Sequence, residues 1–283
     1  MTAPANPGPE RGRLIAVASG KGGVGKTFLA ITLAHAMAAR GSRVLLFDGD
    51  LGLANIDIQL GLVPARDIAT HVGTAAGVLA AVQPCPPCGF DWLPGRSGAA
   101  HLTALAETTL AQLLHGLRAA TDRYDVVIAD LAAGIDPPAR RIAATADTLL
   151  LVATDDPTSL TDAYAVLKLH AADGGSTDRA VVINQVQSPA EGRRAFHTLA
   201  RAAENFLGIT PRLAGTVRRD PRVRDTIRHQ TPLLTRHPQA PAAADIVALA
   251  RELTPERRVA RGGERVPAAG ADDPGPPGGR EDA

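Results

Sequence analysis

Gly20-Lys21-Gly22-Gly23-Val24-Gly25-Lys26-Thr27 is the segment of the sequence with the strongest structural signal. It fits the pattern G-x-x-x-x-G-K-[ST], which is typical of a loop that binds the phosphates of a nucleotide. Glycines let backbone N–H groups approach phosphate oxygens without a Cβ in the way. In this pattern Lys26 is predicted to contact the β- and γ-phosphates, and the Thr27 hydroxyl is predicted to bind Mg²⁺.

The sequence on both sides of the motif supports this interpretation. An apolar, β-prone run at 14–18 precedes it, and an Ala-rich helical stretch from Thr27 to Arg40 follows it. The motif is therefore predicted to lie at a strand-to-helix turn, where the helix N-terminus adds a partial positive charge. The chain has only three lysines, and two of them, Lys21 and Lys26, lie in this loop. A chance glycine-rich turn is the alternative, and this context disfavours it.

Apolar runs of strand length alternate with helical stretches along the rest of the chain. Further strands are predicted at 43–47, 90–93, 125–130, 149–153, 180–183 and 213–217. Further helices are predicted at 68–81, 102–120, 159–170, 190–207, 222–229 and 242–253. Ser159 and Asp162 have capping-box spacing at the start of one of them. Continuous apolar strands separated by helices predict an α/β fold, with a predominantly parallel twisted sheet covered by helices on both faces.

Composition predicts one ordered domain between two disordered ends. Residues 1–12 and 255–283 are rich in Pro and Gly and lack apolar periodicity, so both are predicted to be disordered. Residues 13–254 are predicted to form a phosphate-loop (P-loop) ATPase domain. Hydrophobic residues make up 45% of the chain, and the net charge of +1 excludes a global attraction to nucleic acid or membrane. Without a signal peptide or a membrane-spanning apolar run, a cytoplasmic location is expected.

Acidic residues follow the second and the fourth predicted strand. Asp48 and Asp50 close one of them, and Asp130 closes the other. The carboxyl ends of parallel strands form the ligand-binding edge of open α/β sheets, so these carboxylates are expected beside the phosphate loop. Asp130 and Asp48 are predicted to hold Mg²⁺ through water, together with Thr27. The alternatives are that Asp130 caps the next turn and that Asp50 is a turn residue.

The two cysteines, Cys85 and Cys88, form a lone C-x-x-C. Three interpretations are open: a thioredoxin-like redox pair, half of a metal site completed by a second subunit, or a loop without chemical function. Pro and Gly surround the pair, it does not lie between a strand and a helix, and the chain holds no second ligand pair. A loop without chemical function is the favoured interpretation.

Several segments resemble those of a known family. The loop K-G-G-x-G-K-T, with its early lysine, resembles the deviant Walker A motif of the MinD/ParA ATPases, and residues 48–57 resemble their first switch. Within that superfamily the chain is similar to the flagellar-number regulators of the FlhG/FleN type. The segments that carry this similarity are 48–57, 93–98, 157–164, 182–186, 220–224 and 232–234. The resemblance covers about residues 13 to 253.

The resemblance implies catalytic roles for three residues. Lys21 corresponds to the signature lysine, which reaches the phosphates of the partner subunit in an ATP-bound dimer. Lys26 binds phosphate in its own subunit, and Asp50 positions the hydrolytic water. Residues 20–28 together form the implied ATP-binding loop, with Phe28 as its last member.

Three more residues are implied to contact the nucleotide. Gly134 follows Asp130 in the second switch and offers its amide toward the γ-phosphate. Asn184 hydrogen-bonds the adenine, although a polar residue at the end of a strand is also typical of a turn. The segment around Asp220 packs over the base.

The chain departs from the family pattern at several places. Phe28 stands where a small polar residue often follows the loop threonine, and Leu131-Ala132 replaces a hydroxyl-bearing residue followed by Gly or Pro. Arg218-Arg219 stands where the family commonly has Pro-Glu. The Pro-rich N-terminus is too short for the helical activator motif of many FlhG-type proteins, and the C-terminus lacks the apolar face of a MinD-like membrane helix.

The implied function is an ATP-dependent dimerisation switch that hydrolyses ATP slowly, under partner stimulation, and controls flagellar number, placement or assembly. Its substrate is ATP and its cofactor is Mg²⁺. The implied partners are a second copy of the chain and a flagellar GTPase, a basal-body protein or a transcriptional regulator. Peripheral association with the inner face of the membrane is an open alternative to a purely cytoplasmic location.

Other functions remain open on the sequence alone. A ParA-type DNA-partition ATPase is one, because residues 191–237 hold ten arginines against four acidic residues, which favours phosphate-backbone contacts. Solvated helix faces in an arginine-rich chain are the simpler explanation. An iron–sulfur carrier that uses Cys85 and Cys88 across a dimer is another alternative. A regulator that binds ATP without hydrolysing it is the last.

Overall fold

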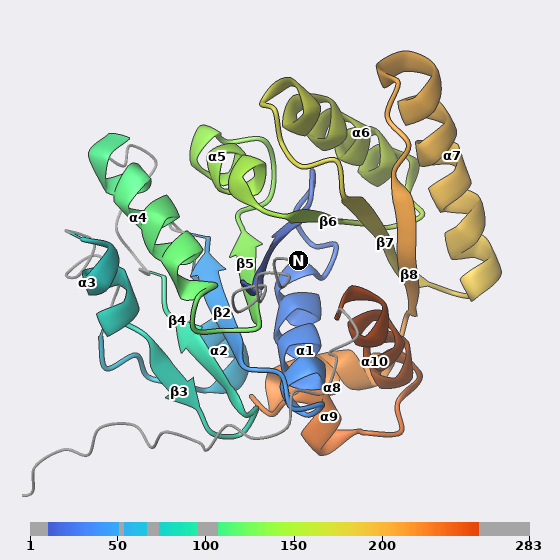
Figure 1. The fold of residues 1–283 in the computed structure, drawn as a ribbon. Coiled ribbons are helices and arrows are strands. Elements are labelled where there is room, and N and C mark those ends of the chain that lie inside the picture. Colours follow the sequence, from blue (N-terminus) through green and yellow to red (C-terminus); the bar gives the residue numbers. More distant parts are fainter. Residues whose placement is uncertain (1–10, 51–53, 67–73, 96–106, 255–283) are drawn as a thin grey trace, which may run out of the picture.

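The computed structural model describes residues 11–50, 54–66, 74–95 and 107–254. Within these ranges the chain forms a single eight-stranded sheet with the order β3-β4-β2-β5-β1-β6-β7-β8 (Figure 1). The strands are β1 (Arg13–Ala18), β2 (Val44–Gly49), β3 (Gln83–Cys85), β4 (Phe90–Leu93), β5 (Val126–Leu131), β6 (Thr148–Ala153), β7 (Arg179–Val186) and β8 (Arg212–Arg218). All neighbouring strands pair in parallel except β3, which is antiparallel to β4.

Ten helices are described between and after the strands. They are α1 (Lys26–Ala38), α2 (Ile56–Leu60), α3 (Ala75–Ala80), α4 (Glu107–Ala120), α5 (Pro137–Thr145), α6 (Pro157–Ala172), α7 (Pro189–Leu207), α8 (Pro221–Arg228), α9 (Leu233–Arg236) and α10 (Pro241–Leu253). None of the described helices combines the length and the apolar character that a membrane crossing requires.

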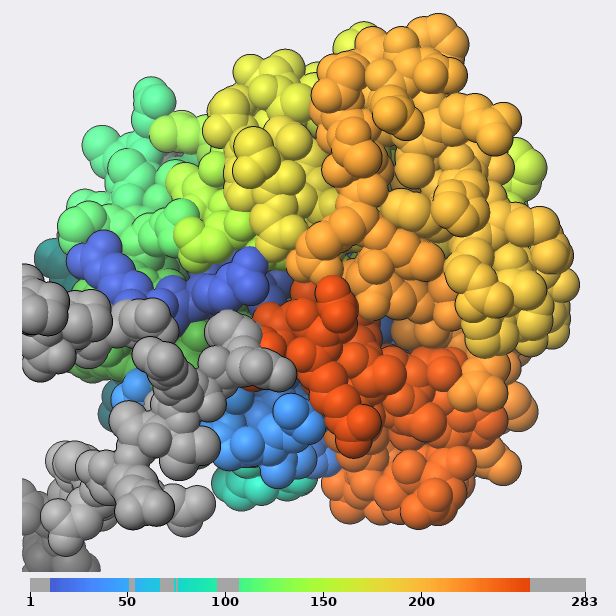
Figure 2. All heavy atoms as spheres, turned by 45° about the vertical axis from the view of Figure 1, so that its right-hand side comes forward, coloured from blue at the N-terminus to red at the C-terminus, as the bar shows by residue number. Residues whose placement is uncertain are grey.

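The sheet separates two apolar cores. Alternate residues of a strand face opposite sides, so Leu14 and Ala16 of β1 pack under α3 to α7, while Ile15 and Val17 pack under α1, α9 and α10. Figure 2 shows α10 and the α8–α9 segment, in red and orange, lying against the blue α1. Because both faces are covered, the strands read as continuous apolar runs, and the predicted parallel sheet with helices on both faces is confirmed.

The elements that the sequence analysis omits are short or polar. These are β3, α2, α5 and α9. The predicted helices at 68–81 and 102–120 are described only as α3 and α4, because residues 67–73 and 96–106 lie outside the described residues. The disorder predicted for the chain ends concerns residues 1–12 and 255–283, of which only 11 and 12 are described.

The capping box predicted at Ser159 is wrong. Helix α6 begins earlier, at Pro157, and Asp156 is its N-cap: one carboxylate oxygen accepts the N–H groups of Thr158 and Ser159. The Ser159 hydroxyl instead accepts the N–H of Thr154 at 3.0 Å. An Asp-Pro pair supplies both the cap and a preset first turn, which explains why the helix starts there.

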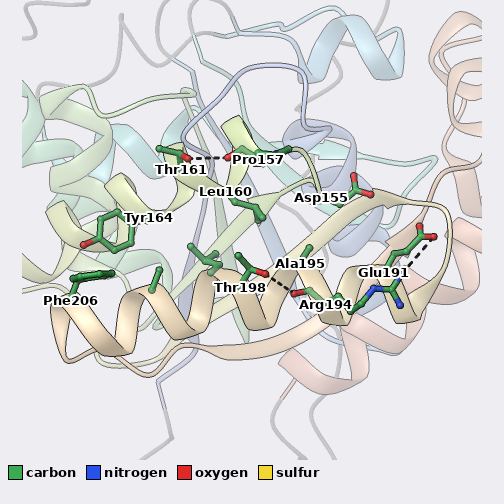
Figure 3. Close-up of a pocket in the computed structure, with 12 residues that line it drawn as sticks. Asp155, Pro157, Leu160, Thr161, Tyr164, Glu191, Arg194, Ala195, Thr198 and Phe206 are labelled. Atoms are coloured by element: carbon green, nitrogen blue, oxygen red, sulfur yellow. Dashed lines mark hydrogen bonds and ion pairs between the residues drawn. The ribbon is translucent and has the colours of Figure 1, made fainter.

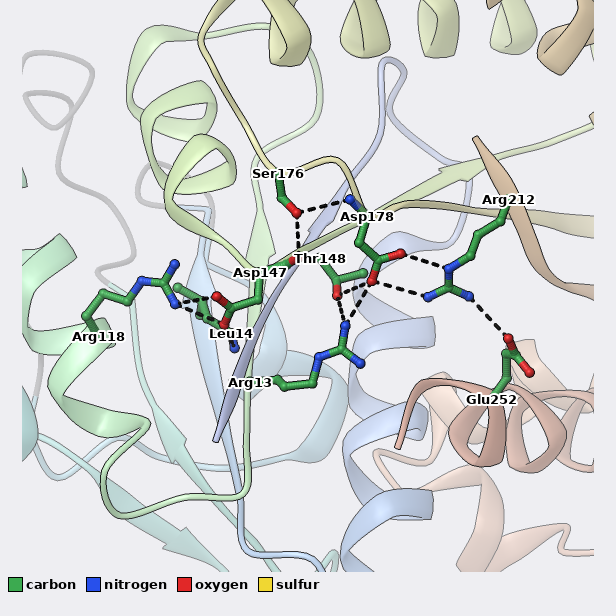
Figure 4. A network of polar contacts seen from close by, with 9 residues as sticks. All are labelled: Arg13, Leu14, Arg118, Asp147, Thr148, Ser176, Asp178, Arg212 and Glu252. Carbon is green, nitrogen blue, oxygen red and sulfur yellow. Dashed lines mark hydrogen bonds and ion pairs between the residues drawn. The ribbon is translucent and has the colours of Figure 1, made fainter. Parts of the chain in front are cut away.

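A polar network joins the amino-terminal ends of four parallel strands (Figure 4). The Asp178 carboxylate, just before β7, accepts from Arg13 at 2.9 Å, from Thr148 at 2.7 Å and from Arg212 at 2.8 Å. Partial burial alone raises the pKa of Asp178, but the hydrogen bonds from Arg212 and Thr148 and the two arginine charges outweigh it and hold that pKa below its usual value. Arg212 also pairs with Glu252 of α10, so the network fixes the edge of the sheet opposite the P-loop.

Candidate functional site

The P-loop connects β1 to α1 at the carboxyl edge of the sheet, as predicted. Gly23 and Gly25 have φ angles of 80° and 83°, in the left-handed region that glycine adopts without strain. A Cβ at Gly25 would also collide with the Asn184 carboxamide. The loop conformation therefore depends on glycine at these positions, and α1 begins immediately after it with Lys26.

Lys26 and Asp130 form a buried ion pair beneath the loop. The Lys26 Nζ lies 2.7 Å from one Asp130 oxygen, and the two side chains are 8% and 0% exposed. The Thr27 hydroxyl lies near enough to Asp130 to lower the pKa of that carboxyl, against the effect of burial. Sequence reasoning placed Lys26, Thr27 and Asp130 at one site, and the structure brings them into contact.

Asp48 lies beside Asp130, because the two are register partners on the neighbouring strands β2 and β5. One Asp48 oxygen accepts the N–H groups of Asn55 and Ile56, both at 3.0 Å, at the start of α2. The other oxygen is buried without a partner among the described residues, and so is the second oxygen of Asp130. Two unsatisfied carboxylate oxygens near a threonine hydroxyl form the oxygen-rich donor set that Mg²⁺ prefers. Thr27, Asp48 and Asp130 therefore fit the predicted ion, directly or through water.

Burial of these carboxylates changes their ionisation. Burial raises the pKa of Asp48 to about 7, opposed by the hydrogen bond from the Ile56 N–H and reinforced by the charge of Asp130. Burial also raises the pKa of Asp130, although the Lys26 ammonium opposes this change. Bringing a cation to the site would favour the ionised form of both carboxylates.

The raised pKa of Asp48 predicts a pH dependence of stability in the absence of Mg²⁺. From about pH 4 to about pH 7, Asp48 ionises in the unfolded chain but keeps its proton in the folded protein, so stability falls as pH rises. Between pH 5 and pH 8 we expect the free energy of unfolding to lose about 3 kcal/mol through this residue. Urea unfolding of the wild type and of Asp48→Asn at both pH values measures it. Equal pH slopes for the two proteins would contradict the assignment.

Lys21, the second loop lysine, points to a different element. Its Nζ donates to the Thr158 hydroxyl at 2.7 Å, in the first turn of α6. The Thr158 hydroxyl in turn donates to Asp156 at 2.6 Å, and this side-chain hydrogen bond is the main cause that lowers the pKa of Asp156. Both Lys21 and Thr158 are exposed, so the ammonium is held at the surface rather than inside its own loop.

The residues expected to contact the base surround the P-loop on the side of β7 and β8. The Asn184 carboxamide donates to the Val24 carbonyl at 2.8 Å and accepts the Gln185 N–H. Asp220 is buried and caps α8 by accepting the Arg222 N–H at 3.0 Å. The adenine contacts of Asn184 and of the segment around Asp220 stay predictions.

The other predicted site residues occupy well-defined places. Gly134, with a φ of 103°, donates its N–H to the Ser19 carbonyl at 2.8 Å and so lies directly beside the P-loop. Asp50 follows β2, close enough for its charge to raise the pKa of Asp130. Phe28 of α1 is part of the apolar core and lines a small cavity together with Thr226 and Ile227 of α8. Residues 51–53 of the first switch lie outside the described residues.

The two cysteines lie in the core instead of at the surface. Cys85 ends β3 and Cys88 follows in a tight turn, in which the Cys85 carbonyl accepts the N–H groups of Cys88 and Gly89. Their side chains are 1% and 3% exposed. An iron–sulfur cluster shared between two subunits needs surface sulfurs, so this geometry gives the carrier alternative no support.

The arginine-rich segment is partly neutralised within the chain. Ion pairs engage Arg194, Arg212, Arg218, Arg222 and Arg236. Arginines that pair with carboxylates contribute less to the binding of a nucleic-acid backbone. The structure therefore adds nothing in favour of the DNA-partition alternative.

A groove of about 870 Å³ runs between α6 and α7 (Figure 3). Its lining is mostly apolar and includes Phe206, which is 77% exposed. An ion pair between Glu191 and Arg194 lies at one end. The α6 wall begins at Pro157, next to the threonine that holds Lys21. The sequence of segment 157–164 resembles the flagellar regulators but indicates neither the groove nor the contact with Lys21.

Comparison with known proteins agrees with this geometry. Residues 15–233 match the family described as the CobQ/CobB/MinD/ParA nucleotide binding domain. The antiactivator FleN of Pseudomonas aeruginosa is 37% identical over 241 residues, which cover 85% of this chain and 86% of FleN. The flagellum site-determining protein YlxH of Helicobacter pylori is 30% identical over 193 residues, which cover 68% of this chain and 65% of YlxH.

Solved structures show the same fold. The cell-division ATPase MinD of Pyrococcus furiosus has a TM-score of 0.68 at 25% identity and matches 85% of this chain and 98% of its own. MinD of Pyrococcus horikoshii, in complex with Mg-ADP, has a TM-score of 0.69 at 23% identity, over 85% of this chain and 95% of its own. The chain therefore belongs to the CobQ/CobB/MinD/ParA nucleotide-binding family, as a MinD/ParA ATPase related to the flagellar regulators of the FlhG/FleN type.

Proposed function

We propose that this protein is a switch that dimerises on binding Mg-ATP, hydrolyses ATP slowly and regulates flagellar number or placement. The observation that carries the proposal is the position of Lys21. Its ammonium lies at the surface and contacts Thr158 of α6, outside the loop to which it belongs. A lysine held at the surface can reach the nucleotide of a second copy. Its own loop does not need Lys21 to bind phosphate, because Lys26 and the backbone amides supply those contacts.

The residues of this chain divide the work of hydrolysis. Lys26 exchanges its contact with Asp130 for the β- and γ-phosphates, and Asp50 orients the attacking water. Lys21 of the second copy neutralises phosphate charge from the other side. Thr27, Asp48 and Asp130 would hold magnesium, which would neutralise the charge that develops on the phosphate oxygens. Positioning and electrostatic stabilisation therefore account for most of the rate.

A single substitution tests the dimerisation switch. Lys21→Arg is expected to retain ATP binding and to lose ATP-induced dimerisation, because a planar guanidinium does not replace a compact ammonium in a tight contact. Size-exclusion chromatography with a nonhydrolysable ATP analogue, together with calorimetry, separates the two properties. Lys168→Arg, at an exposed lysine on α6, is the matched control. An unchanged shift in elution for Lys21→Arg would reject this role.

The proposed flagellar role rests on the relatives. FleN is named an antiactivator and YlxH a flagellum site-determining protein. We propose an activator protein of flagellar genes as the partner of this chain, docked in the groove between α6 and α7, where Phe206 offers an exposed apolar side chain. Because the first turn of α6 both lines the groove and holds Lys21, we propose that occupation of the groove is coupled to release of Lys21. Counting flagella on cells that carry Phe206→Ser tests this part, and a normal number would contradict it.

A further inference from the structure

Two non-glycine residues among those described have a positive φ, and both are glutamines. Gln185 has a φ of 59° and Gln230 a φ of 50°. A left-handed backbone conformation is unfavourable for a residue with a side chain such as glutamine, and it persists only where surrounding contacts hold it. Each glutamine makes such a contact: the Gln185 Nε2 donates to the Gly23 carbonyl at 3.0 Å, and the Gln230 Nε2 donates to the Ile58 carbonyl at 2.9 Å. The first of these carbonyls belongs to the P-loop.

An irregularity at the end of β7 brings Gln185 to the loop. The register between β7 and β8 shifts between Ile183 and Val186, around Asn184 and Gln185. In a regular strand two successive side chains point to opposite faces. Here the bulge and the left-handed residue direct both carboxamides to the same side, where Asn184 reaches the Val24 carbonyl and Gln185 reaches that of Gly23. Two consecutive amides thus hold two consecutive P-loop carbonyls.

We propose that Gln185 is a positioning residue for nucleotide binding, because it orients the Gly23–Val24 peptide, whose N–H faces the phosphates. In a planar trans peptide the C=O and N–H point in opposite directions. Fixing the Gly23 carbonyl toward Gln185 therefore aims the Val24 N–H away from β7, into the loop, where the anion is bound. This inference rests on the proposed binding of ATP and adds to it a residue that the family pattern does not assign.

The surroundings of Gly23 show why the hydrogen bond from Gln185 matters for the conformation of the loop. A Cβ built at Gly22 or at Gly23 meets nothing within 4 Å, so the Cα positions of these two glycines are not held by packing of the described residues. Gly23 has a positive φ, and because glycine adopts positive and negative φ about equally readily, its backbone is easily rotated. On the Val24 side the peptide is anchored by the buried Val24 side chain and by Asn184, and on the Gly23 side the hydrogen bond from Gln185 is the described contact that limits its rotation. Without the Gln185 hydrogen bond this peptide is ordered only when the nucleotide binds, and the cost of ordering it lowers the affinity.

The experiment compares two glycine substitutions. Gln185→Gly and Gln230→Gly both relieve a left-handed side chain and both remove a hydrogen bond to a remote carbonyl, but only the first touches the P-loop. We expect Gln185→Gly to bind Mg-ADP about tenfold more weakly than the wild type in titration calorimetry. Gln230→Gly is expected to bind within about twofold of the wild type, a difference of a few tenths of a kcal/mol. Thermal unfolding without nucleotide should change alike in the two variants.

A third variant keeps the inference testable if Gln185→Gly folds poorly. Gln185→Glu preserves size but replaces the donor by a carboxylate that repels both the Gly23 carbonyl and the phosphates, so it is expected to bind more weakly still. Wild-type affinity in Gln185→Gly or in Gln185→Glu would overturn the proposal, as would an equal loss in Gln230→Gly. Because Mg-ADP binding does not need dimerisation, a wild type that binds but never dimerises would reject the switch and leave this comparison intact.

Discussion

Lys26→Met is expected to destabilise the nucleotide-free protein by about 4 kcal/mol and to abolish measurable ATP binding. The substitution removes the partner of Asp130, whose side chain is completely buried, and so leaves an uncompensated carboxylate in the core. It also removes the cation that the P-loop offers to the phosphates. Urea unfolding measures the first effect, and calorimetry with Mg-ATP measures the second.

The control for this substitution is Lys168→Met. Lys168 is exposed on α6, and its replacement is expected to change stability by less than about 0.5 kcal/mol. A second substitution that removes the unpaired buried charge provides a further check. Lys26→Met combined with Asp130→Asn should be more stable than Lys26→Met alone. Equal stabilities of the single and the double variant would show that the ion pair does not hold this site together.

Asp50→Ala is expected to lower phosphate release about 10²-fold or more, toward the buffer background, while ATP binding and ATP-induced dimerisation persist. Asp50 follows β2 at the carboxyl edge of the sheet, close enough to Asp130 to influence its ionisation. Removing it takes away the group that orients water and leaves the loop contacts unchanged. Steady-state phosphate release and size-exclusion chromatography separate these effects.

Asp57→Ala offers a matched acidic control. Asp57 lies in the first turn of α2, where its carboxylate accepts the Ile58 N–H. We expect it to retain wild-type phosphate release. Identical release by the wild type and Asp50→Ala would mean that the protein binds ATP without hydrolysing it, the catalytically silent regulator that the sequence left open.

The sheet could be predicted from the sequence because burial on both faces leaves a simple signal. Strand β5 is apolar from Val126 to Ala129 and carries Asp130 as its last residue but one, so both its place in the core and the position of its acidic residue could be predicted. Short elements gave no such signal. Strand β3 is three residues long and contains Pro84, and α5 combines two prolines with two arginines. Local composition of this kind is typical of loops, and only packing against β4, or against β1 and α6, defines these elements.

The site was predictable in its residues but not in its contacts. A motif assigns Lys21 to the loop, yet nothing in its spacing indicates the hydrogen bond to Thr158, 137 residues further along the chain. The role of Gln185 could not be predicted either. It depends on a bulge and a positive φ, and a polar residue at the end of a strand does not by itself indicate them. The capping error at Ser159 has a similar origin: two start signals lie close together, and the Asp-Pro pair prevails.

Burial of both native thiols has a practical consequence for spectroscopy. Cys85 and Cys88 are the only cysteines of the chain, and each is almost completely enclosed. A maleimide dye would therefore react with neither in the folded state, and a single engineered thiol, such as Lys168→Cys on the outer side of α6, would take up the label alone. Energy transfer between two labelled copies would then follow association and release in real time, without removal of the natural sulfurs.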